Sequence, residues 1–207
     1  MENKIQYRLI KKFGPSIFHV RIPEEIITKL NNYVDKVVQD KQKSKELDVG
    51  KNLVGDVTQE LVLEHDFIRK SGWYNFLGLC VNQWIKLETN KEVKKFEIKN
   101  AWIVRQFENE YNPIHYHSGH ISGAGYIMLP DSFGDSFQKT KKRNTNGNIN
   151  FTYGVKQFMN NGHISYKPKV GDFYIFPNYL FHSVNPFFGP GERRSISFNA
   201  FIDDKIY

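Results

Sequence analysis

The order of hydrophobic and polar positions divides the chain into a helical first part and a strand-rich second part. Apolar residues at 26–38 recur every three or four positions, which predicts a helix over 23–43. A second pattern of this kind predicts a helix that begins at 71 and includes apolar positions up to 85. Alternating stretches at 6–10 and 16–22 predict strands ahead of the first helix.

From residue 96 the spacing changes to that of short strands separated by turn residues. Residues 44–66 show no clear pattern, and 50–55 is typical of a loop. Helices followed by many strands predict a mainly β fold, a sandwich or barrel with N-terminal helices on one sheet. We expect a single domain over 1–207, in which 1–95 supports a barrel core at 96–207. The predicted strands of that core are 96–107, 121–129, 148–153, 163–167, 172–176 and 193–202.

Composition supports this reading. The chain has 207 residues, with 17 Phe and 11 Tyr, and aromatic side chains favour pleated sheets. The single cysteine, Cys80, lies in an apolar stretch and is expected to be a small core residue. No run of about 18 apolar residues occurs, and residues 1–4 lack the form of a signal peptide, so the expectation is a cytoplasmic protein without a membrane span.

The chain is basic, with 29 Lys and Arg against 22 Asp and Glu and a net charge of +7. Part of the charge is clustered at 139–143 and 91–99, which indicates solvated surface or attraction to a polyanion such as nucleic acid. No nucleic-acid fold motif accompanies these runs, so nucleic acid is the weaker alternative.

Three histidines are candidate metal ligands. His115 and His117 are two positions apart, and side chains at i and i+2 of a strand point the same way. His182 follows 65 residues after His117, beyond an apolar stretch that ends at Pro177. Each histidine alone is as well explained by ordinary packing or exposure; together they can meet at one metal if the strands close into a barrel.

Arg193 and Ser195 are candidate ligands for an anion. In a strand over 193–202, alternation places Arg193, Ser195 and Ser197 on one face and Arg194 on the other. A guanidinium binds a carboxylate through two parallel hydrogen bonds, and a serine hydroxyl adds a third. An exposed Arg193 without a ligand is the alternative.

These motifs resemble the Fe(II)/2-oxoglutarate-dependent oxygenase superfamily, and most closely its small, prolyl-hydroxylase-like members in phages and bacteria. The resemblance implies a double-stranded β-helix, or jelly-roll, core with a metal at its open mouth. It also implies Fe(II) as cofactor, 2-oxoglutarate as co-substrate, and a hydroxylase that couples its decarboxylation to oxidation of a substrate C–H bond. His115 would be the first iron ligand and His182 the distal one; Arg193 and Ser195 would bind the far carboxylate, with Tyr126 in reach of it. The residues that carry the resemblance are Asn112-Pro-Ile-His-Tyr-His117, Ser122-Gly-Ala-Gly-Tyr126, Gly171-Asp-Phe-Tyr-Ile-Phe-Pro177, His182 and Arg193-x-Ser195.

The chain departs from the family pattern at His117, where the usual ligand is Asp or Glu. His117 is either a third ligand in a three-histidine face, or the first ligand with His115 behind it. In a third arrangement, two histidines and water hold the iron. The three-histidine face is the arrangement that we expect.

The substrate is not encoded in these motifs. We expect the loop over 131–148, with Phe133, Phe137 and its basic run, to face the substrate, because loops at the barrel mouth usually select it. A protein side chain, a nucleotide or a small molecule is each compatible with the sequence.

Two other classes remain open at this stage. A cupin-like metal dioxygenase without 2-oxoglutarate matches the histidines, but it lacks the glutamate of the first cupin motif and has no role for Arg193 and Ser195. A non-catalytic jelly-roll binding module would explain the missing carboxylate, but it has no need of both histidines and the arginine.

Overall fold

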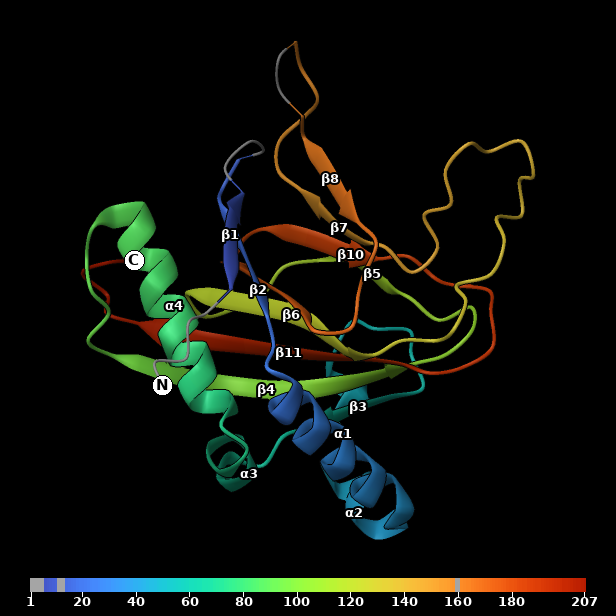
Figure 1. The fold of residues 1–207 in the computed structure, drawn as a ribbon, viewed down its shortest axis with the longest axis horizontal. Helices are drawn as coiled ribbons and strands as arrows, with labels where there is room; N and C mark the ends of the chain where they lie inside the picture. The colour runs from blue at the N-terminus through green and yellow to red at the C-terminus, as the bar shows by residue number, and fades with distance from the viewer. Residues whose placement is uncertain (1–5, 11–13, 159–160) are drawn as a thin grey trace.

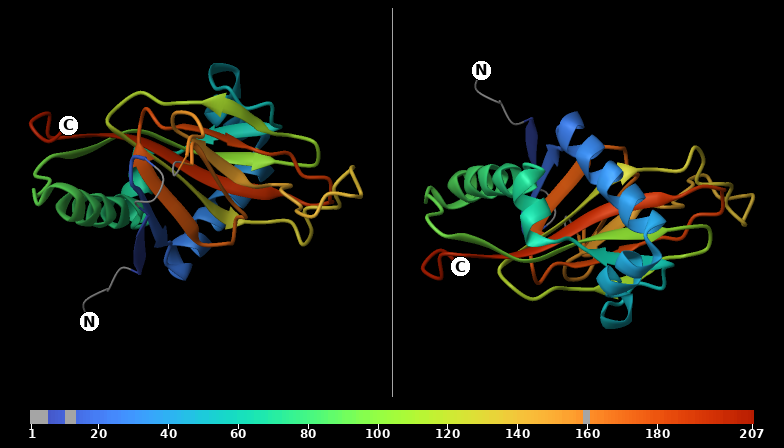
Figure 2. Two further views of the ribbon diagram at one scale, coloured as in Figure 1. Left: turned by 90° about the horizontal axis from the view of Figure 1, so that it is seen from above. Right: turned by 90° about the horizontal axis from the view of Figure 1, so that it is seen from below.

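The computed structural model describes residues 6–10, 14–158 and 161–207, and contains two antiparallel sheets that face each other (Figures 1 and 2). The large sheet has the strand order β1-β2-β9-β6-β11-β4-β3, and the small sheet has the order β5-β10-β7-β8. Residues 1–4, on which the expectation about a signal peptide depends, lie outside the described residues. Within the described ranges, no helix combines the length and apolar character that a bilayer crossing needs.

The elements of the first half are β1 (Tyr7–Ile10), β2 (Ile17–Arg21), α1 (Glu24–Gln39), α2 (Lys41–Leu47), the 3-10 turn η1 (Gly50–Asn52), β3 (Gln59–Val62), α3 (His65–Lys70) and α4 (Trp73–Thr89). Those of the second half are β4 (Phe96–Gln106), β5 (Asn112–His115), β6 (Ile121–Met128), β7 (Ile149–Thr152), β8 (His163–Tyr166), β9 (Asp172–Pro177), β10 (Phe181–Val184) and β11 (Arg193–Ile202). The mainly β jelly roll with N-terminal helices is therefore confirmed.

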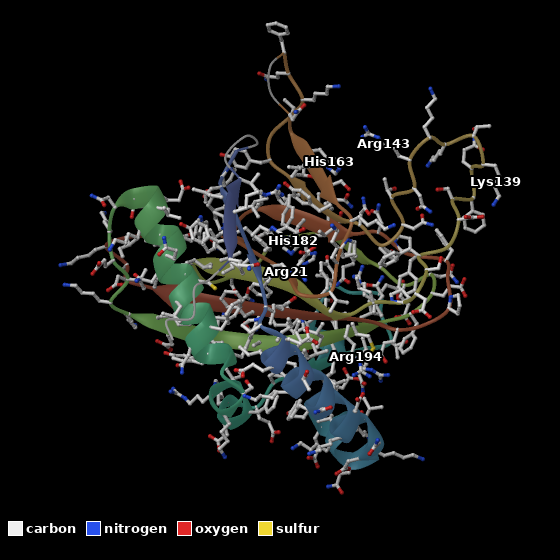
Figure 3. The ribbon with its side chains drawn as sticks, in the orientation of Figure 1. Arg21, Lys139, Arg143, His163, His182 and Arg194 are labelled. Carbon is white, nitrogen blue, oxygen red and sulfur yellow. The ribbon has the colours of Figure 1, made fainter. Side chains whose placement is uncertain are left out.

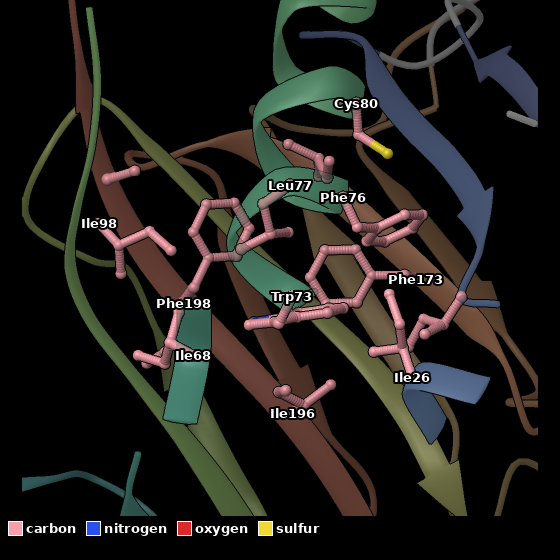
Figure 4. Close-up of a cluster of buried hydrophobic side chains, with 14 of the residues drawn as sticks. Ile26, Ile68, Trp73, Phe76, Leu77, Cys80, Ile98, Phe173, Ile196 and Phe198 are labelled. Atoms are coloured by element: carbon pink, nitrogen blue, oxygen red, sulfur yellow. The ribbon is translucent and has the colours of Figure 1, made fainter. Parts of the chain in front are cut away.

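The helices cover the outer face of the large sheet (Figure 1). Trp73 of α4 is fully buried and meets Phe173 edge to face, with ring centres 5.0 Å apart. Phe198 and Ile196 of β11 join this core, as Figure 4 shows. Cys80 is buried in the same cluster, as expected of a small core residue. This side of the sheet holds most of the buried apolar surface.

The inner face of the large sheet looks toward the small sheet and is only partly filled. A second, smaller cluster there contains mainly aromatic side chains, among them Phe151, Tyr174 and Phe176. Strand alternation along β11 sends Ile196 outward to the helices and Ser195 inward. The space that the inner cluster leaves open contains the candidate site.

Two predictions for the first half need correction. The helix predicted over 23–43 breaks at Asp40, whose carboxylate accepts hydrogen bonds from the backbone N–H groups of Gln42 and Lys43 and so caps a new helix, α2. The segment 44–66, in which only a loop was recognised, also contains β3 and the beginning of α3. Both elements are too short to show a clear period.

Candidate metal centre and anion pocket

The three candidate histidines converge between the two sheets. The ring centres of His115 and His182 lie 4.2 Å apart, and the ring of His117 lies 4.9 Å from each of them. One nitrogen from each ring lies within 4.8 Å of the others, and this is the group of potential metal ligands found among the described residues. Figure 3 labels His182 on β10, inside the sandwich.

Strand pairing positions two of the histidines. His182 is directly opposite His115 in the antiparallel pair β10–β5, and it is opposite Phe151 on β7. The prediction that His117 lies on the same strand as His115 was wrong, because β5 ends at His115. Instead, the backbone N–H of His117 donates to the backbone carbonyl of Asn178 at 2.9 Å. The side-chain amide of Asn178 donates back to the backbone carbonyl of His117 at 3.2 Å. This reciprocal pair fixes the loop that turns His117 toward the other two rings.

Hydrogen bonds orient the rings for metal binding. His115 Nδ1 lies 2.7 Å from the Pro113 carbonyl and His182 Nδ1 lies 3.0 Å from the Leu180 carbonyl. Because a carbonyl only accepts, each Nδ1 carries the proton, and each Nε2 keeps a free lone pair. His117 Nε2 lies 3.2 Å from His182 Nε2. Two imidazole ligands at right angles, each about 2.1 Å from a metal, would lie about 3.0 Å apart, so the spacing of His117 and His182 suits a shared divalent ion.

Electrostatics keep the three rings in the ligand form. Burial lowers the pKa of His117 to about 3, with a further contribution from His115. Burial also lowers the pKa of His115, and it lowers that of His182 well below the usual value. Neutral imidazoles are the form that coordinates metals.

A cavity of about 260 Å³ opens beside the histidines. Ser195 and Tyr126 line it on the large sheet, and the predicted strand alternation there is confirmed. The main residues of the lining are His115, His117, His182, Tyr126, Ser195, Ser197, Asn199, Trp102, Val104, Glu60, Asn112 and residues 52–54.

Arg193 lies behind this lining with an incomplete set of partners. It is fully buried; Nη1 donates to the Gly147 carbonyl at 3.1 Å, and Nη2 donates to Gln106 Oε1 at 2.5 Å. Among the described residues, its Nε has no acceptor, and the hydroxyl of Tyr126 has no partner either. The guanidinium carbon lies 5.5 Å from the centre of the Tyr126 ring. Burial lowers the pKa of Arg193 and raises that of Tyr126 to about 12, so a buried cation and a neutral phenol adjoin the cavity.

The loop predicted to face the substrate, residues 131–148, does not contribute to the lining of this cavity. Phe133 meets Phe187 edge to face at 5.7 Å, Phe137 meets Phe188 at 4.8 Å, and neither phenylalanine lines the cavity. Figure 3 shows Lys139 and Arg143 on the same loop, which projects away from the sheets. Its contact with a substrate stays a prediction.

Sequence reasoning missed several residues of the cavity. The most consequential is Glu60, which β3 places inside the lining together with the short segment 52–54. The alternation of Gln59-Glu-Leu-Val is a weak strand signal that could have identified it. Trp102 and Asn199 were inside predicted strands, but nothing in their spacing marked them as cavity residues.

A jelly roll that gathers three neutral imidazoles at an open cavity, with a buried arginine behind it, defines a class: metal-dependent enzymes of the double-stranded β-helix fold. The comparisons identify the family within that class. A model described as "Putative 2OG-Fe(II) oxygenase" matches residues 100–199, the segment that contains all three histidines, Tyr126, Arg193 and Ser195. A search of curated proteins gave no match.

Solved structures share the fold at low identity. A prolyl-4-hydroxylase from Pseudomonas putida is 12% identical, with 93% of this chain and 91% of that chain covered and a TM-score of 0.57. A viral collagen prolyl hydroxylase from Paramecium bursaria Chlorella virus-1, in complex with 2OG, is 14% identical over 94% of each chain, with a TM-score of 0.50. The α-ketoglutarate-dependent epimerase SnoN from nogalamycin biosynthesis is 12% identical over 89% of this chain and 77% of that chain, with a TM-score of 0.59.

Over residues 100–199 the chain matches the Fe(II)/2-oxoglutarate-dependent oxygenase family. It is an oxidoreductase with iron as cofactor and 2-oxoglutarate as co-substrate.

Proposed function

We propose that His115, His117 and His182 together hold the Fe(II) of this dioxygenase, as a three-histidine face. The observation that carries the proposal is the convergence of their nitrogens within 4.8 Å, with two Nδ1 atoms occupied by carbonyls. Neutral imidazoles on one side of an ion leave its other positions open for ligands that are not protein. The iron and 2-oxoglutarate, when bound, supply the oxidising chemistry.

Arg193 and Ser195 are proposed to bind the far carboxylate of 2-oxoglutarate. The free Nε of Arg193 and the free hydroxyl of Tyr126 are buried polar atoms that lack partners, and each would gain one from a carboxylate. The Tyr126 ring lines the cavity, and its centre lies 5.5 Å from the guanidinium carbon of Arg193, so its hydroxyl would contact the same carboxylate. The role of these residues is to orient the co-substrate and to exclude water from it.

In this function, His117 takes the position of the usual carboxylate ligand. An imidazole leaves the iron centre one charge more positive than Asp or Glu would. The reaction oxidises a substrate C–H bond, most simply to a hydroxyl. The substrate class, a cytoplasmic location and a phage origin stay predictions.

The test is an anaerobic titration of the Fe(II)-loaded protein with 2-oxoglutarate, followed by the visible metal-to-ligand charge-transfer band. We expect a band in the wild type, and a weaker or absent one in Arg193→Ala at the same concentration. No band, with iron shown to be bound, would favour a cupin-like dioxygenase that does not use 2-oxoglutarate. A protein that binds no iron would point to a non-catalytic jelly roll.

A further inference from the structure

Glu60 is a buried acid in the cavity wall, and no cationic side chain of the described residues pairs with it. Its side chain is 1% exposed, and Oε2 has no hydrogen-bond partner among the described residues. Asp172, the other buried acid of the described chain, is paired with His19 and Arg21 instead. Burial, with Asp48 nearby, raises the pKa of Glu60 to about 7. A buried carboxylate normally has a partner, and its absence indicates that a ligand provides one.

Strand register places Glu60 on the opposite side of the cavity from the anion site. Glu60 is directly across from Val104, and Val104 is directly across from Ser195. Strands in a sheet are about 4.8 Å apart, so the Glu60 and Ser195 backbones are separated by about 10 Å. The cavity therefore has a buried cation near one end and a buried acid near the other.

The carboxyl group also adjoins the strand that carries His115. The position that a Cβ atom would take on Gly55 lies 3.2 Å from Glu60 Oε1 and 2.8 Å from the side-chain amide nitrogen of Asn112, so these two polar groups are close together. Asn112 begins β5 and His115 ends it, which corresponds to about 10 Å along a strand. A molecule held at Glu60 can thus extend along β5 to the histidines.

The wall between these two ends is apolar. Trp102 and Val104 line it, and the Trp102 ring is 5.6 Å from the His117 ring. An aliphatic chain suits this wall, whereas a nucleotide phosphate beside Glu60 would be repelled.

We propose that Glu60 selects a substrate with an ammonium or guanidinium group on an aliphatic chain, as in the side chains of lysine and arginine. This inference rests on the proposed function. The cation pairs with the Glu60 carboxylate, and a methylene of the chain is presented to the iron. The reaction balances as C–H + O2 + 2-oxoglutarate → C–OH + succinate + CO2, with one oxygen atom entering the new hydroxyl and the other entering succinate. The substrate carbon and the keto acid are oxidised, and O2 is reduced.

The test uses the anaerobic protein with Fe(II) and 2-oxoglutarate, and measures binding by calorimetry. The probes are the Nα-acetyl amides of lysine and arginine, with the neutral analogues norleucine and citrulline in the same form. Free lysine and a lysine peptide flanked by alanines, as further arms, distinguish an amino acid from a peptide source. The variants are Glu60→Gln and, as a matched loss of one charge, Glu64→Gln, whose carboxylate pairs with Lys43 outside the cavity.

At least one basic probe should bind the wild type 10-fold or more tightly than its neutral analogue. Glu60→Gln should lose that preference, and Glu64→Gln should keep it. Equal binding of neutral and basic probes, no binding of any probe, or an unchanged preference in Glu60→Gln would overturn the proposal. The comparison of lysine with norleucine needs no variant, so it decides even if Glu60→Gln folds poorly.

The charge-transfer band separates the two proposals. A normal band without preference for basic probes contradicts the role of Glu60 and leaves the oxygenase site intact. A missing band in iron-loaded protein contradicts the proposed co-substrate site, while the calorimetry without 2-oxoglutarate still decides whether Glu60 selects cations.

Discussion

Arg193 and Arg194 are adjacent, yet they lie in opposite surroundings. Arg194 points to the helix side of the large sheet, where it forms ion pairs with Glu192 at 2.8 Å and Asp35 at 2.7 Å; Figure 3 shows it near α1. Arg193 points inward and is fully buried, and its acceptors in the described part of the chain are the Gly147 carbonyl and the Gln106 side-chain amide. Arg194 has its counter-charges within the protein, whereas no described acidic residue pairs with Arg193. The difference supports our proposal that Arg193 binds an anion, whereas the ion pairs of Arg194 stabilise the fold.

The same division extends along β11. Ile196, Phe198 and Ala200 pack into the helix-covered core, while Ser195, Ser197 and Asn199 line the cavity. Because alternate residues of a strand face opposite ways, one face of β11 packs into the core and the other lines the cavity that holds the proposed site. Substitutions on the two faces should therefore have different consequences.

The largest effect is expected at the metal centre. His182→Ala removes one of three ligands and should lower Fe(II) affinity by about 100-fold or more. His120→Ala is the matched control, because His120 stacks on Tyr207 outside the cluster. Competition titration with a metal indicator measures the Fe(II) affinity of both variants. Equal affinities in the two variants would contradict the proposed ligand set.

The two arginines give the next largest effect. Arg193→Met removes the cation but keeps the volume, and should weaken 2-oxoglutarate binding by about 10- to 100-fold, since a charged hydrogen bond contributes about 1.5–3 kcal/mol. Arg194→Met should leave this affinity within about 2-fold and lower the free energy of unfolding by roughly 1–3 kcal/mol. Anaerobic titration and urea unfolding measure the two quantities. If both variants lost co-substrate affinity equally, the contrast between the faces would be wrong.

A prediction of a different kind concerns the pH dependence of stability at Glu60. Its pKa rises from an ordinary value of 4.5 to about 7 on folding, so between these values the unfolded chain loses a proton that the folded chain keeps. Stability from this group is therefore lost as the pH rises from about 4.5 to 7, by about 3 kcal/mol in all.

Glu60→Gln lacks this titration. Urea unfolding of the metal-free protein at pH 5 and pH 8 should show the variant gaining roughly 2–3 kcal/mol relative to the wild type at the higher pH. The histidines titrate in both proteins, so their contribution cancels in the difference. If the unfolding free energies of the variant and the wild type differed by the same amount at pH 5 and at pH 8, Glu60 would have an ordinary pKa.

The smallest effect is expected for Ser195→Ala. Loss of one neutral hydrogen bond to the co-substrate should weaken 2-oxoglutarate binding about 5-fold, because such a bond contributes about 1 kcal/mol. Ser197→Ala, one step further along the same face, should change it less. A larger loss of 2-oxoglutarate affinity in Ser197→Ala than in Ser195→Ala would indicate that the anion site lies further along β11.

Strand alternation and turn residues are local signals, so the sequence predicted β4, β6, β7, β8, β9 and β11 and the inward direction of Ser195. The pairing of His115 with His182 could be expected only through the family resemblance, because it depends on β5 and β10 meeting in the small sheet. The position of His117 depends on Asn178, 61 residues away, and local spacing does not encode that contact. The sequence did not mark Glu60 as a cavity residue, because β3 has only four residues and the burial of Glu60 follows from the pairing of β3 with β4.

The most direct test of the central claim is a crystal structure of the anaerobic protein with Fe(II) and 2-oxoglutarate. Our account predicts one metal ion bound by Nε2 of His115, His117 and His182, and the far carboxylate of 2-oxoglutarate on Arg193 and Ser195. A metal bound elsewhere, or a carboxylate that leaves the Arg193 guanidinium without an anion, would contradict it.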